Sequence, residues 1–173
     1  MGSAIVINPP IFTEIPRSER GAEAAGFSGT IRELEESSAT VELAAAALGC
    51  QGARIAKTLS FLTAGGPVLI VAAGDARVDN HRFKEEFGEK ARMIPADQVE
   101  ALVGHAPGGV CPFALLPGVR TYLDESLRRF ETVFPAAGSS NSAVEMTLAQ
   151  LESCCGGFVK WADLCRGWRE AEQ

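Results

Sequence analysis

Short apolar runs alternate along this chain with turns marked by glycine and proline, and the period of each run predicts its secondary structure. Alternating or fully apolar runs predict strands over residues 53–62, 68–73, 91–94, 119–123, 143–146 and 158–162. Spacing and end signals predict helices over residues 17–25, 41–48, 79–87, 95–103 and 147–154, with a helical turn over 126–130. Because strands and helices do not alternate regularly, the pattern indicates a mixed α/β domain rather than a doubly wound sheet.

Several elements carry clear end signals. Thr40 can cap the helix over residues 41–48, and Asp79 can cap the next one. Thr147 and Gln150 have the spacing of a capping box. The run over residues 68–73 is apolar throughout, which predicts a strand buried on both faces.

Lys57 is the most unusual position in these runs. Side chains alternate across a strand, so Lys57 shares one face with Ile55, Leu59 and Phe61, which are all apolar. A lysine there needs a partner, extends to solvent or meets an anionic ligand. Two interpretations remain open: an ordinary snorkelling or ion-paired lysine, and a cation that binds a phosphate or donates to an ester.

A stiff glycine loop, Pro107-Gly108-Gly109-Val110-Cys111-Pro112-Phe113, follows about fifty residues later. Two glycines between two prolines predict a turn in any protein. Glycine also lets a ligand approach the main chain, where adjacent N–H groups can hold an anion or a developing oxyanion. The loop is therefore either a plain turn or part of a ligand site.

Two further side chains have a chemical and an ordinary interpretation. Cys111 is either a nucleophile, whose base could only be His81 or His105, or a small buried thiol. Asp124, at the end of a predicted strand, either orients a ligand or caps the following turn. We find no Ser-His-Asp order, Walker loop or Rossmann fingerprint.

Composition narrows the possibilities. A chain of 173 residues with 46% hydrophobic residues can bury the core of one domain, and its longest apolar run is too short to span a membrane. The N-terminus has no secretory signal pattern. Five cysteines without a C-x-x-C pair predict reduced thiols in a cytoplasm and no structural metal.

The net charge of −6 argues against an extended surface that contacts duplex phosphates, and so against DNA binding. It allows local binding of one RNA end. Local basic groups exist, although each can be plain solvated surface. They are Arg77, Arg82 and Lys84; Lys90 and Arg92; Arg128 and Arg129; and Lys160, Arg166 and Arg169.

A succession of segments resembles a known family. The segments are residues 42–49 (ELAAAALG), 55–59 (IAKTL), 68–71 (VLIV), 107–113 (PGGVCPF), 121–127 (TYLDESL), 136–138 (AAG) and 146–151 (MTLAQL). In this order and spacing the chain resembles the YbaK and prolyl-tRNA-synthetase editing-domain family of trans-acting aminoacyl-tRNA deacylases. The strand lysine and the G-x-x-x-P loop from Gly108 to Pro112 are the most specific parts.

The resemblance implies a compact α/β fold with a mixed, barrel-like sheet flanked by helices. The editing domain would span residues 38–165, after an N-terminal segment over 1–37 and before a polar tail over 166–173. The implied activity is hydrolysis of the ester that joins a wrong amino acid to the tRNA 3′ end, without metal or cofactor. The partners would be a tRNA acceptor end and, as an alternative means of delivery, a synthetase, with no membrane.

The resemblance also implies site roles. Lys57 would contact the terminal adenosine and its phosphate, and backbone groups of Gly108, Gly109 and Cys111 would hold the aminoacyl carbonyl and a water. The tRNA's own terminal hydroxyl would help to activate the attacking group. The implied substrate-binding residues are Thr58, Val110, Pro112, Phe113, Asp124 and Asn141.

This chain departs from the family at two positions. Relatives often have serine or another small residue where Cys111 stands, and some have a histidine where this chain has Ser139, Ser140 and Asn141. Both places belong to the implied aminoacyl pocket, so they affect substrate identity more than reaction type. We expect a small side chain: alanine, serine, threonine or cysteine.

Three hypotheses follow for the function. The first is a trans-editing hydrolase, which predicts that Lys57→Ala abolishes deacylation. The second is a non-catalytic module of the same fold that recognises tRNA ends, nucleotides or a synthetase. The third is a cysteine-dependent hydrolase acting through Cys111.

Overall fold

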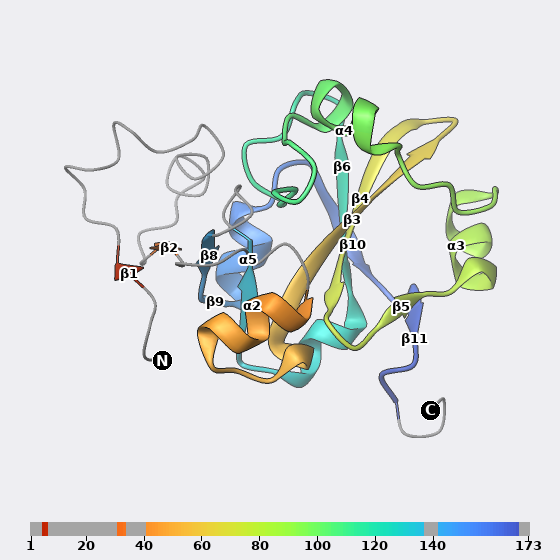
Figure 1. Cartoon of the computed structure of the whole chain (residues 1–173). Coiled ribbons are helices and arrows are strands. Elements are labelled where there is room, and N and C mark those ends of the chain that lie inside the picture. The colour runs from red at the N-terminus through yellow and green to blue at the C-terminus, as the bar shows by residue number, and fades with distance from the viewer. Residues whose placement is uncertain (1–4, 7–30, 34–40, 137–141, 170–173) are drawn as a thin grey trace.

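The computed structural model describes residues 5–6, 31–33, 41–136 and 142–169, and Figure 1 shows their arrangement. Thr40 and the helix expected over residues 17–25 lie outside the described residues, as does Asn141.

A six-stranded mixed sheet forms the centre of the domain, with the strand order β10-β6-β4-β3-β7-β9. Its strands are β3 (Ile55–Thr63), β4 (Gly66–Ala73), β6 (Arg120–Asp124), β7 (Thr132–Pro135), β9 (Met146–Thr147) and β10 (Phe158–Ala162). The long β3–β4 hairpin is antiparallel, whereas β4 pairs in parallel with β6 and β3 pairs in parallel with β7. The prediction of strands in both orientations is therefore confirmed.

Two smaller sheets complete the strand pairing of the described residues. Strands β1 (Ile5–Val6), β2 (Ile31–Glu33) and β8 (Ser142–Val144) form one of them, so the N-terminal segment pairs with the domain through β2. Strands β5 (Arg77–Val78) and β11 (Cys165–Arg166) form an antiparallel ribbon. The polar tail expected from residue 166 therefore begins inside a paired strand.

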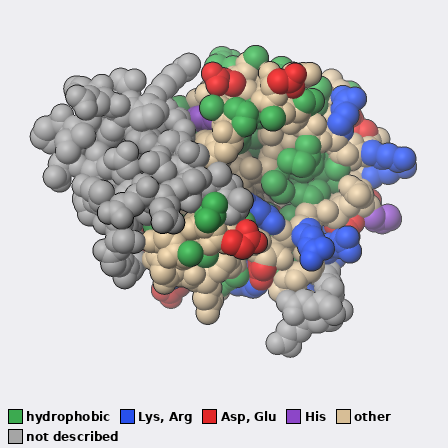
Figure 2. All heavy atoms as spheres, in the orientation of Figure 1, with side chains coloured by type: hydrophobic (Ala, Val, Ile, Leu, Met, Phe, Trp, Pro, Cys, Tyr) green, Lys and Arg blue, Asp and Glu red, His purple; other side chains and the backbone are tan. Residues whose placement is uncertain are grey.

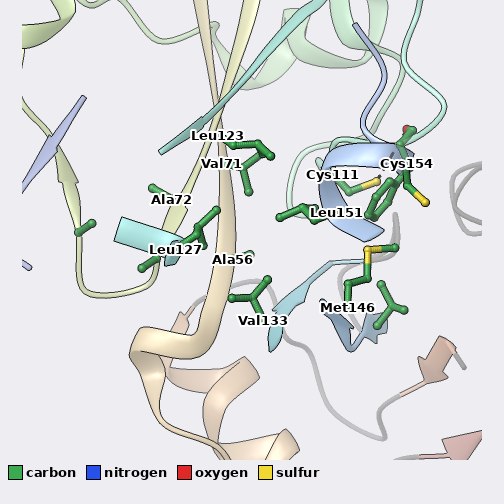
Figure 3. Packing of buried hydrophobic residues seen from close by; sticks show 14 of the residues in the cluster. Ala56, Val71, Ala72, Cys111, Leu123, Leu127, Val133, Met146, Leu151 and Cys154 are labelled. Atoms are coloured by element: carbon green, nitrogen blue, oxygen red, sulfur yellow. Dashed lines mark hydrogen bonds between the residues drawn. The ribbon is translucent and has the colours of Figure 1, made fainter. Parts of the chain in front are cut away.

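Helices cover both faces of the central sheet (Figure 1). They are α2 (Val41–Leu48), α3 (Asn80–Phe87), α4 (Ala96–Val103) and α5 (Leu148–Cys154), with 3-10 turns η2 (Gly52–Arg54) and η3 (Glu125–Arg129). Phe83 of α3 packs with Phe61, Val68 and Ile70 on one face. On the other face α4 packs against Leu69, and Leu151 of α5 joins the cluster that contains Val71 (Figure 3).

The predicted caps of α3 and α5 are confirmed. The Asp79 carboxylate accepts from the N–H groups of His81 and Arg82 at the start of α3. Thr147 and Gln150 form the reciprocal capping box of α5. Residues 68–73 of β4 are fully buried, as their unbroken apolar run predicted.

The central sheet differs from the prediction at residues 91–94 and at β7. Residues 91–94 do not form a strand of their own; Met93 makes an isolated bridge to Phe61. Strand β7 was not predicted, because its apolar run is short and contains Pro135, which is unfavourable in a strand. Its pairing partners lie in distant segments of the chain.

Candidate active site

A break in the pairing of β3 defines the candidate site. At its start, Ile55 and Ala56 pair with β7. Towards its end, the N–H of Ile94 donates to the carbonyl of Ser60 (3.0 Å), and the N–H of Leu62 donates to the carbonyl of Arg92 (2.9 Å). The backbone between these two contacts has no paired strand on this edge among the described residues.

Backbone groups alternate in direction along a strand, so Thr58 turns its N–H and C=O to the same edge as Ser60. Its side-chain hydroxyl Oγ1 is buried and has no hydrogen-bond partner among the described residues. The break therefore presents main-chain polar groups that are available to a ligand, above a buried hydroxyl that has no partner among the described residues.

A cleft of about 370 Å³ lies at this break. Its walls combine β3 with α2, α4, β7 and the glycine loop, and most of the lining residues are apolar. They are Val41, Ala44, Ile55, Ala56, Lys57, Thr58, Leu59, Ser60, Met93, Ile94, Ala96, Val99, Pro107, Gly108, Val110, Phe134 and Ala136. Figure 2 shows a hydrophobic patch at the centre of this face, with acidic and basic side chains around it.

Lys57 supplies the charged side chain among these lining residues. Its Nζ donates to the carbonyl oxygen of Gly74 (3.4 Å), and no described carboxylate lies within ion-pair distance. Burial lowers the pKa of the Lys57 ammonium from the ordinary lysine value of 10.5, although the carboxylates of Asp75 and Glu42 oppose this shift. The structure thus does not support the ion-paired interpretation and leaves a half-buried cation at the cleft.

The contact between Lys57 and Gly74 depends on a close approach of two backbone segments. A Cβ atom on Gly74 would lie 2.0 Å from the carbonyl oxygen of Gly52 and 2.7 Å from Cγ1 of Val41. A side chain at this position would force β4 and η2 apart. Glycine therefore lets the chain after β4 pass close to η2 and α2, with its carbonyl oxygen within reach of Lys57.

The glycine loop is a tight turn whose first part faces the cleft. The N–H of Gly109 donates to the carbonyl of Ala106 (3.0 Å), and Gly108 has φ +85°. Proline at the second position and a positive φ at the third are features of a type II turn. The N–H of Gly109 is thus used within the turn. The expectation that backbone groups of the loop hold the aminoacyl carbonyl and a water stays a prediction.

Other N–H groups of the loop remain available. Those of Gly108 and Val110 have no partner among the described residues, and both residues line the cleft. Pro112 and Phe113 are buried behind the loop, where the carbonyl of Pro112 accepts from the N–H of Gly156 (2.8 Å). Direct contact with a ligand is therefore open to Gly108 and Val110 rather than to Pro112 and Phe113.

Cys111 does lie beside a histidine, but the pair is sealed from the cleft. Its Sγ is 3.6 Å from Nε2 of His105, and the two residues are 0% and 3% exposed. Nε2 of His105 is also 2.6 Å from the carbonyl oxygen of Phe113. Because a carbonyl oxygen only accepts, this Nε2 carries a hydrogen and cannot take the thiol proton.

Cys111 instead belongs to a hydrophobic cluster with Leu151 and Cys154 (Figure 3). It does not line the cleft. The structure therefore favours the small buried thiol over the nucleophile.

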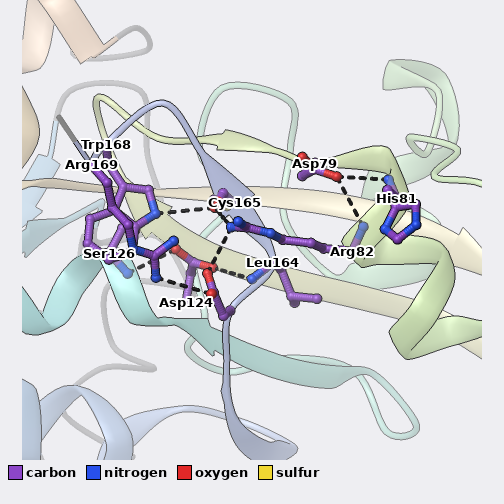
Figure 4. A network of polar contacts seen from close by, with 10 residues as sticks. Asp79, His81, Arg82, Asp124, Ser126, Leu164, Cys165, Trp168 and Arg169 are labelled. Carbon is purple, nitrogen blue, oxygen red and sulfur yellow. Dashed lines mark hydrogen bonds and ion pairs between the residues drawn. The ribbon is translucent and has the colours of Figure 1, made fainter. Parts of the chain in front are cut away.

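Asp124 caps the turn that follows β6. One carboxylate oxygen accepts from the N–H of Ser126 (3.0 Å) and the other from the N–H of Leu164 (2.8 Å), as Figure 4 shows. The side chain is fully buried and does not line the cleft. The structure therefore supports the cap interpretation of Asp124. The expected contact of Asp124 with substrate stays a prediction, which its burial away from the cleft does not favour.

Sequence reasoning identified Lys57, Thr58, Gly108 and Val110 as site residues, and all four line the cleft. It missed most of the apolar walls, namely Val41 and Ala44 of α2, Met93, Ile94, Val99 and Phe134. Met93 carried no signal in the sequence, because its exposure of 55%, unusual for a large apolar residue, appears only in the structure. Phe134 carried none, since it lies on the strand that the sequence did not predict.

No group of three or more histidine, cysteine, aspartate or glutamate side chains in the described part of the chain is arranged to hold a metal ion. None of the helices in this part is long and apolar enough to cross a membrane.

Comparison with known proteins identifies the family. The model of the aminoacyl-tRNA editing domain matches residues 35–154, which is more than half of the chain. The lysine and the glycine turn at the open edge of β3 thus belong to a domain of the aminoacyl-tRNA deacylase class. The chain belongs to the aminoacyl-tRNA editing domain family.

Individual relatives agree with this assignment. The uncharacterized protein YwhH of Bacillus subtilis is 51% identical over 139 residues, which cover 80% of this chain and 88% of that protein. A proline–tRNA ligase of Geobacter sp. is 26% identical over 121 residues, which cover 69% of this chain but only 21% of the ligase.

Solved structures show the same fold. A candidate trans-editing enzyme for prolyl tRNA synthetase has a TM-score of 0.79 and 30% identity, and the match covers 88% of this chain and 99% of that one. The hypothetical protein APE2540 has a TM-score of 0.76 and 31% identity, with 87% and 99% covered. The expected mixed α/β fold, with a barrel-like sheet flanked by helices, is therefore confirmed, and the sheet is a curled half-barrel.

Proposed function

We propose that this protein hydrolyses the ester of a mischarged tRNA that carries a small, uncharged amino acid, and that the reaction takes place in the cleft at the break of β3. The observation that carries the proposal is the half-buried Lys57 ammonium, which lines the cleft without a carboxylate partner. A cation in this state favours an anionic ligand, and the 3′ end of tRNA brings phosphates next to the ester.

Lys57 binds the terminal adenosine and its phosphate in this account. The cation loses part of its hydration by burial, so an incoming phosphate meets a lower desolvation cost than at an exposed lysine. The edge-directed backbone N–H and C=O of Thr58 supply hydrogen bonds to the sugar and the ester beside the phosphate.

The free N–H groups of Gly108 and Val110 polarise the ester carbonyl. They come from a turn held by its own hydrogen bond, so they need little reorganisation when negative charge develops on the carbonyl oxygen. Water attacks the ester carbon, the bond to the tRNA oxygen breaks, and that oxygen takes up a proton. The products are the free amino acid and the uncharged tRNA.

The tRNA itself assists the attack through its remaining terminal hydroxyl. An aminoacyl ester is already activated, so positioning and carbonyl polarisation can supply much of the rate. This role is supported by the make-up of the cleft lining, which among the described residues contains neither a carboxylate nor a histidine that could act as a general base.

The lining also bears on the amino acid. Apart from Lys57, Thr58 and Ser60, the side chains around the cleft are apolar or absent. Alanine, serine, threonine and cysteine esters fit such a surface better than amino acids with charged side chains, because a buried charge needs a partner. A tRNA acceptor end, a cytoplasmic location and delivery by a synthetase belong to the same proposal.

The proposal is tested with purified protein and a panel of tRNAs charged with alanine, serine, threonine or cysteine, with and without a synthetase. We expect release of at least one of these amino acids above the uncatalysed rate. Removal of the free terminal hydroxyl from the responsive tRNA should then slow release strongly. Background release across the whole panel by folded protein would contradict the proposal and favour a binding module.

A further inference from the structure

Two arginines face each other across the β5–β11 ribbon. Arg77 pairs with Arg166 in the antiparallel register, so both side chains leave the same face of the ribbon. Both residues are exposed. Like charges directly opposite each other destabilise a strand pair, which makes this arrangement unfavourable unless an anion binds between or beside them.

Arg166 is near enough to Asp79 that its charge contributes to lowering the pKa of that carboxyl, after the larger effect of backbone hydrogen bonds. The carboxylates nearest in the chain still relieve the repulsion only in part, because each is engaged elsewhere. Asp75 pairs with Arg129, Asp79 caps α3, and Asp163 pairs with Arg82 and Arg169. Figure 4 shows the Asp79 cap and the neighbouring contact of Arg82 with the backbone of Cys165. Among the described residues, neither Arg77 nor Arg166 has an ion pair or a hydrogen bond through its side chain.

The arginine pair lies beside the lysine end of the cleft. Strand β5 follows the end of β4 after three residues, and the first of these, Gly74, accepts the hydrogen bond from Lys57. Arg77 is near enough that its charge contributes to lowering the pKa of Lys57, after the larger effect of burial. Figure 2 shows basic side chains gathered over β5 and β11, next to the hydrophobic hollow.

We propose that Arg77 and Arg166 bind backbone phosphates of the tRNA acceptor strand, just before the terminal nucleotide enters the cleft. This inference rests on the proposed function, since it continues the path of the substrate beyond Lys57. A guanidinium presents a planar fork of donors that matches phosphate oxygens, and two of them side by side fit successive phosphates of one strand.

RNA fits this surface better than an acidic protein segment does. The ribbon lies directly beside the lysine that would hold the last phosphate, so one strand can contact all three cations in turn. The protein is acidic overall, and this local basic site gives the strand a defined point of attachment. Because phosphate contacts carry no sequence information, the pair would serve acceptor ends of different sequence.

The test uses an RNA minihelix with a single-stranded 3′ end and the full chain carrying Arg77→Gln, Arg166→Gln or both. The matched control is Lys90→Gln, which removes the same charge from an exposed lysine beyond the opposite end of α3. We expect each arginine variant to bind the minihelix about tenfold more weakly, as for a lost charge-assisted contact. The slope of log K against log salt should decrease by about one per arginine.

A second measurement separates this role from a structural one. Since each substitution removes a repulsion, the arginine variants should melt at the same temperature as wild type or higher. Wild-type affinity and salt slope in both single variants and the double variant would overturn the inference. So would a loss of binding that is equal in Lys90→Gln.

Failure of this inference is distinguishable from failure of the proposed function. If wild type releases amino acid from tRNA while the arginine variants do so with unchanged KM, only the arginine site is wrong. If wild type releases none, the proposed function itself fails.

Discussion

Replacing Asp124 should cost stability rather than catalysis. The carboxylate accepts two backbone N–H groups, from Ser126 and Leu164, and it is fully buried. Asp124→Ala leaves both donors without a partner in the protein interior. An unsatisfied buried donor costs about 1–3 kcal/mol, so we expect a loss of roughly 3–5 kcal/mol in the free energy of unfolding.

Asp124→Asn provides a milder step in the same series. The amide oxygen can still accept from one N–H group, but the amide nitrogen then faces the other donor. We expect a loss of roughly 2–3 kcal/mol, because one contact is retained and weakened. Asp97→Ala is the control, since this carboxylate is exposed in the first turn of α4 and should contribute about 0.5 kcal/mol.

The assay is urea unfolding followed by deacylation at a temperature where every variant is folded. We expect the unfolding midpoint to fall in the order Asp97→Ala, Asp124→Asn, Asp124→Ala, with turnover per folded molecule close to wild type throughout. A variant at Asp124 that keeps its stability but loses turnover would refute the cap interpretation and restore Asp124 as a substrate ligand.

Three further predictions concern the cleft and its surroundings. Cys111→Ala should keep wild-type turnover, because the thiol is sealed and His105 cannot deprotonate it; a loss of turnover in folded Cys111→Ala would revive the cysteine hydrolase. Gly108→Ala should reduce kcat/KM about tenfold or more, because a φ of +85° strains any side chain, by about 1–2 kcal/mol. Gly88→Ala, with φ +75° and open space around its Cβ, imposes the same strain away from the cleft and should leave kcat/KM unchanged. Finally, the ratio of catalysed to uncatalysed deacylation should fall as the pH rises, and the fall should begin below pH 10.5. Burial lowers the pKa of Lys57, so the ammonium loses its proton at a lower pH than an ordinary lysine does. A ratio that stays flat beyond pH 10.5 would contradict the role of Lys57 as a cation.

Local signals explain how much of the fold was predictable. Alternation along β3 identified Lys57 as anomalous, and the caps at Asp79 and Thr147 marked the starts of α3 and α5. Each of these depends on residues within a few positions of one another. Strands β5, β7 and β11 were missed because their pairing partners lie far away in the chain and their own sequences are short.

The same limit applies to the site. Its chemistry could be predicted, since a lysine in an apolar strand and a Pro-Gly-Gly loop are unusual locally. Its geometry could not, because the cleft exists where β7 leaves β3 before residues 92–94 join it. Nor could the sequence show that the Gly109 N–H closes a turn, or that Arg77 lies opposite Arg166.

The most direct test of the central claim compares Lys57→Ala with Lys84→Ala in single-turnover deacylation of the mischarged tRNA that wild type cleaves. Both variants lose one positive charge, but Lys84 is exposed on α3, whereas Lys57 lines the cleft. We predict that Lys57→Ala lowers the rate by about 100-fold or more while Lys84→Ala matches wild type. Folded Lys57→Ala that deacylates within twofold of wild type would contradict the account.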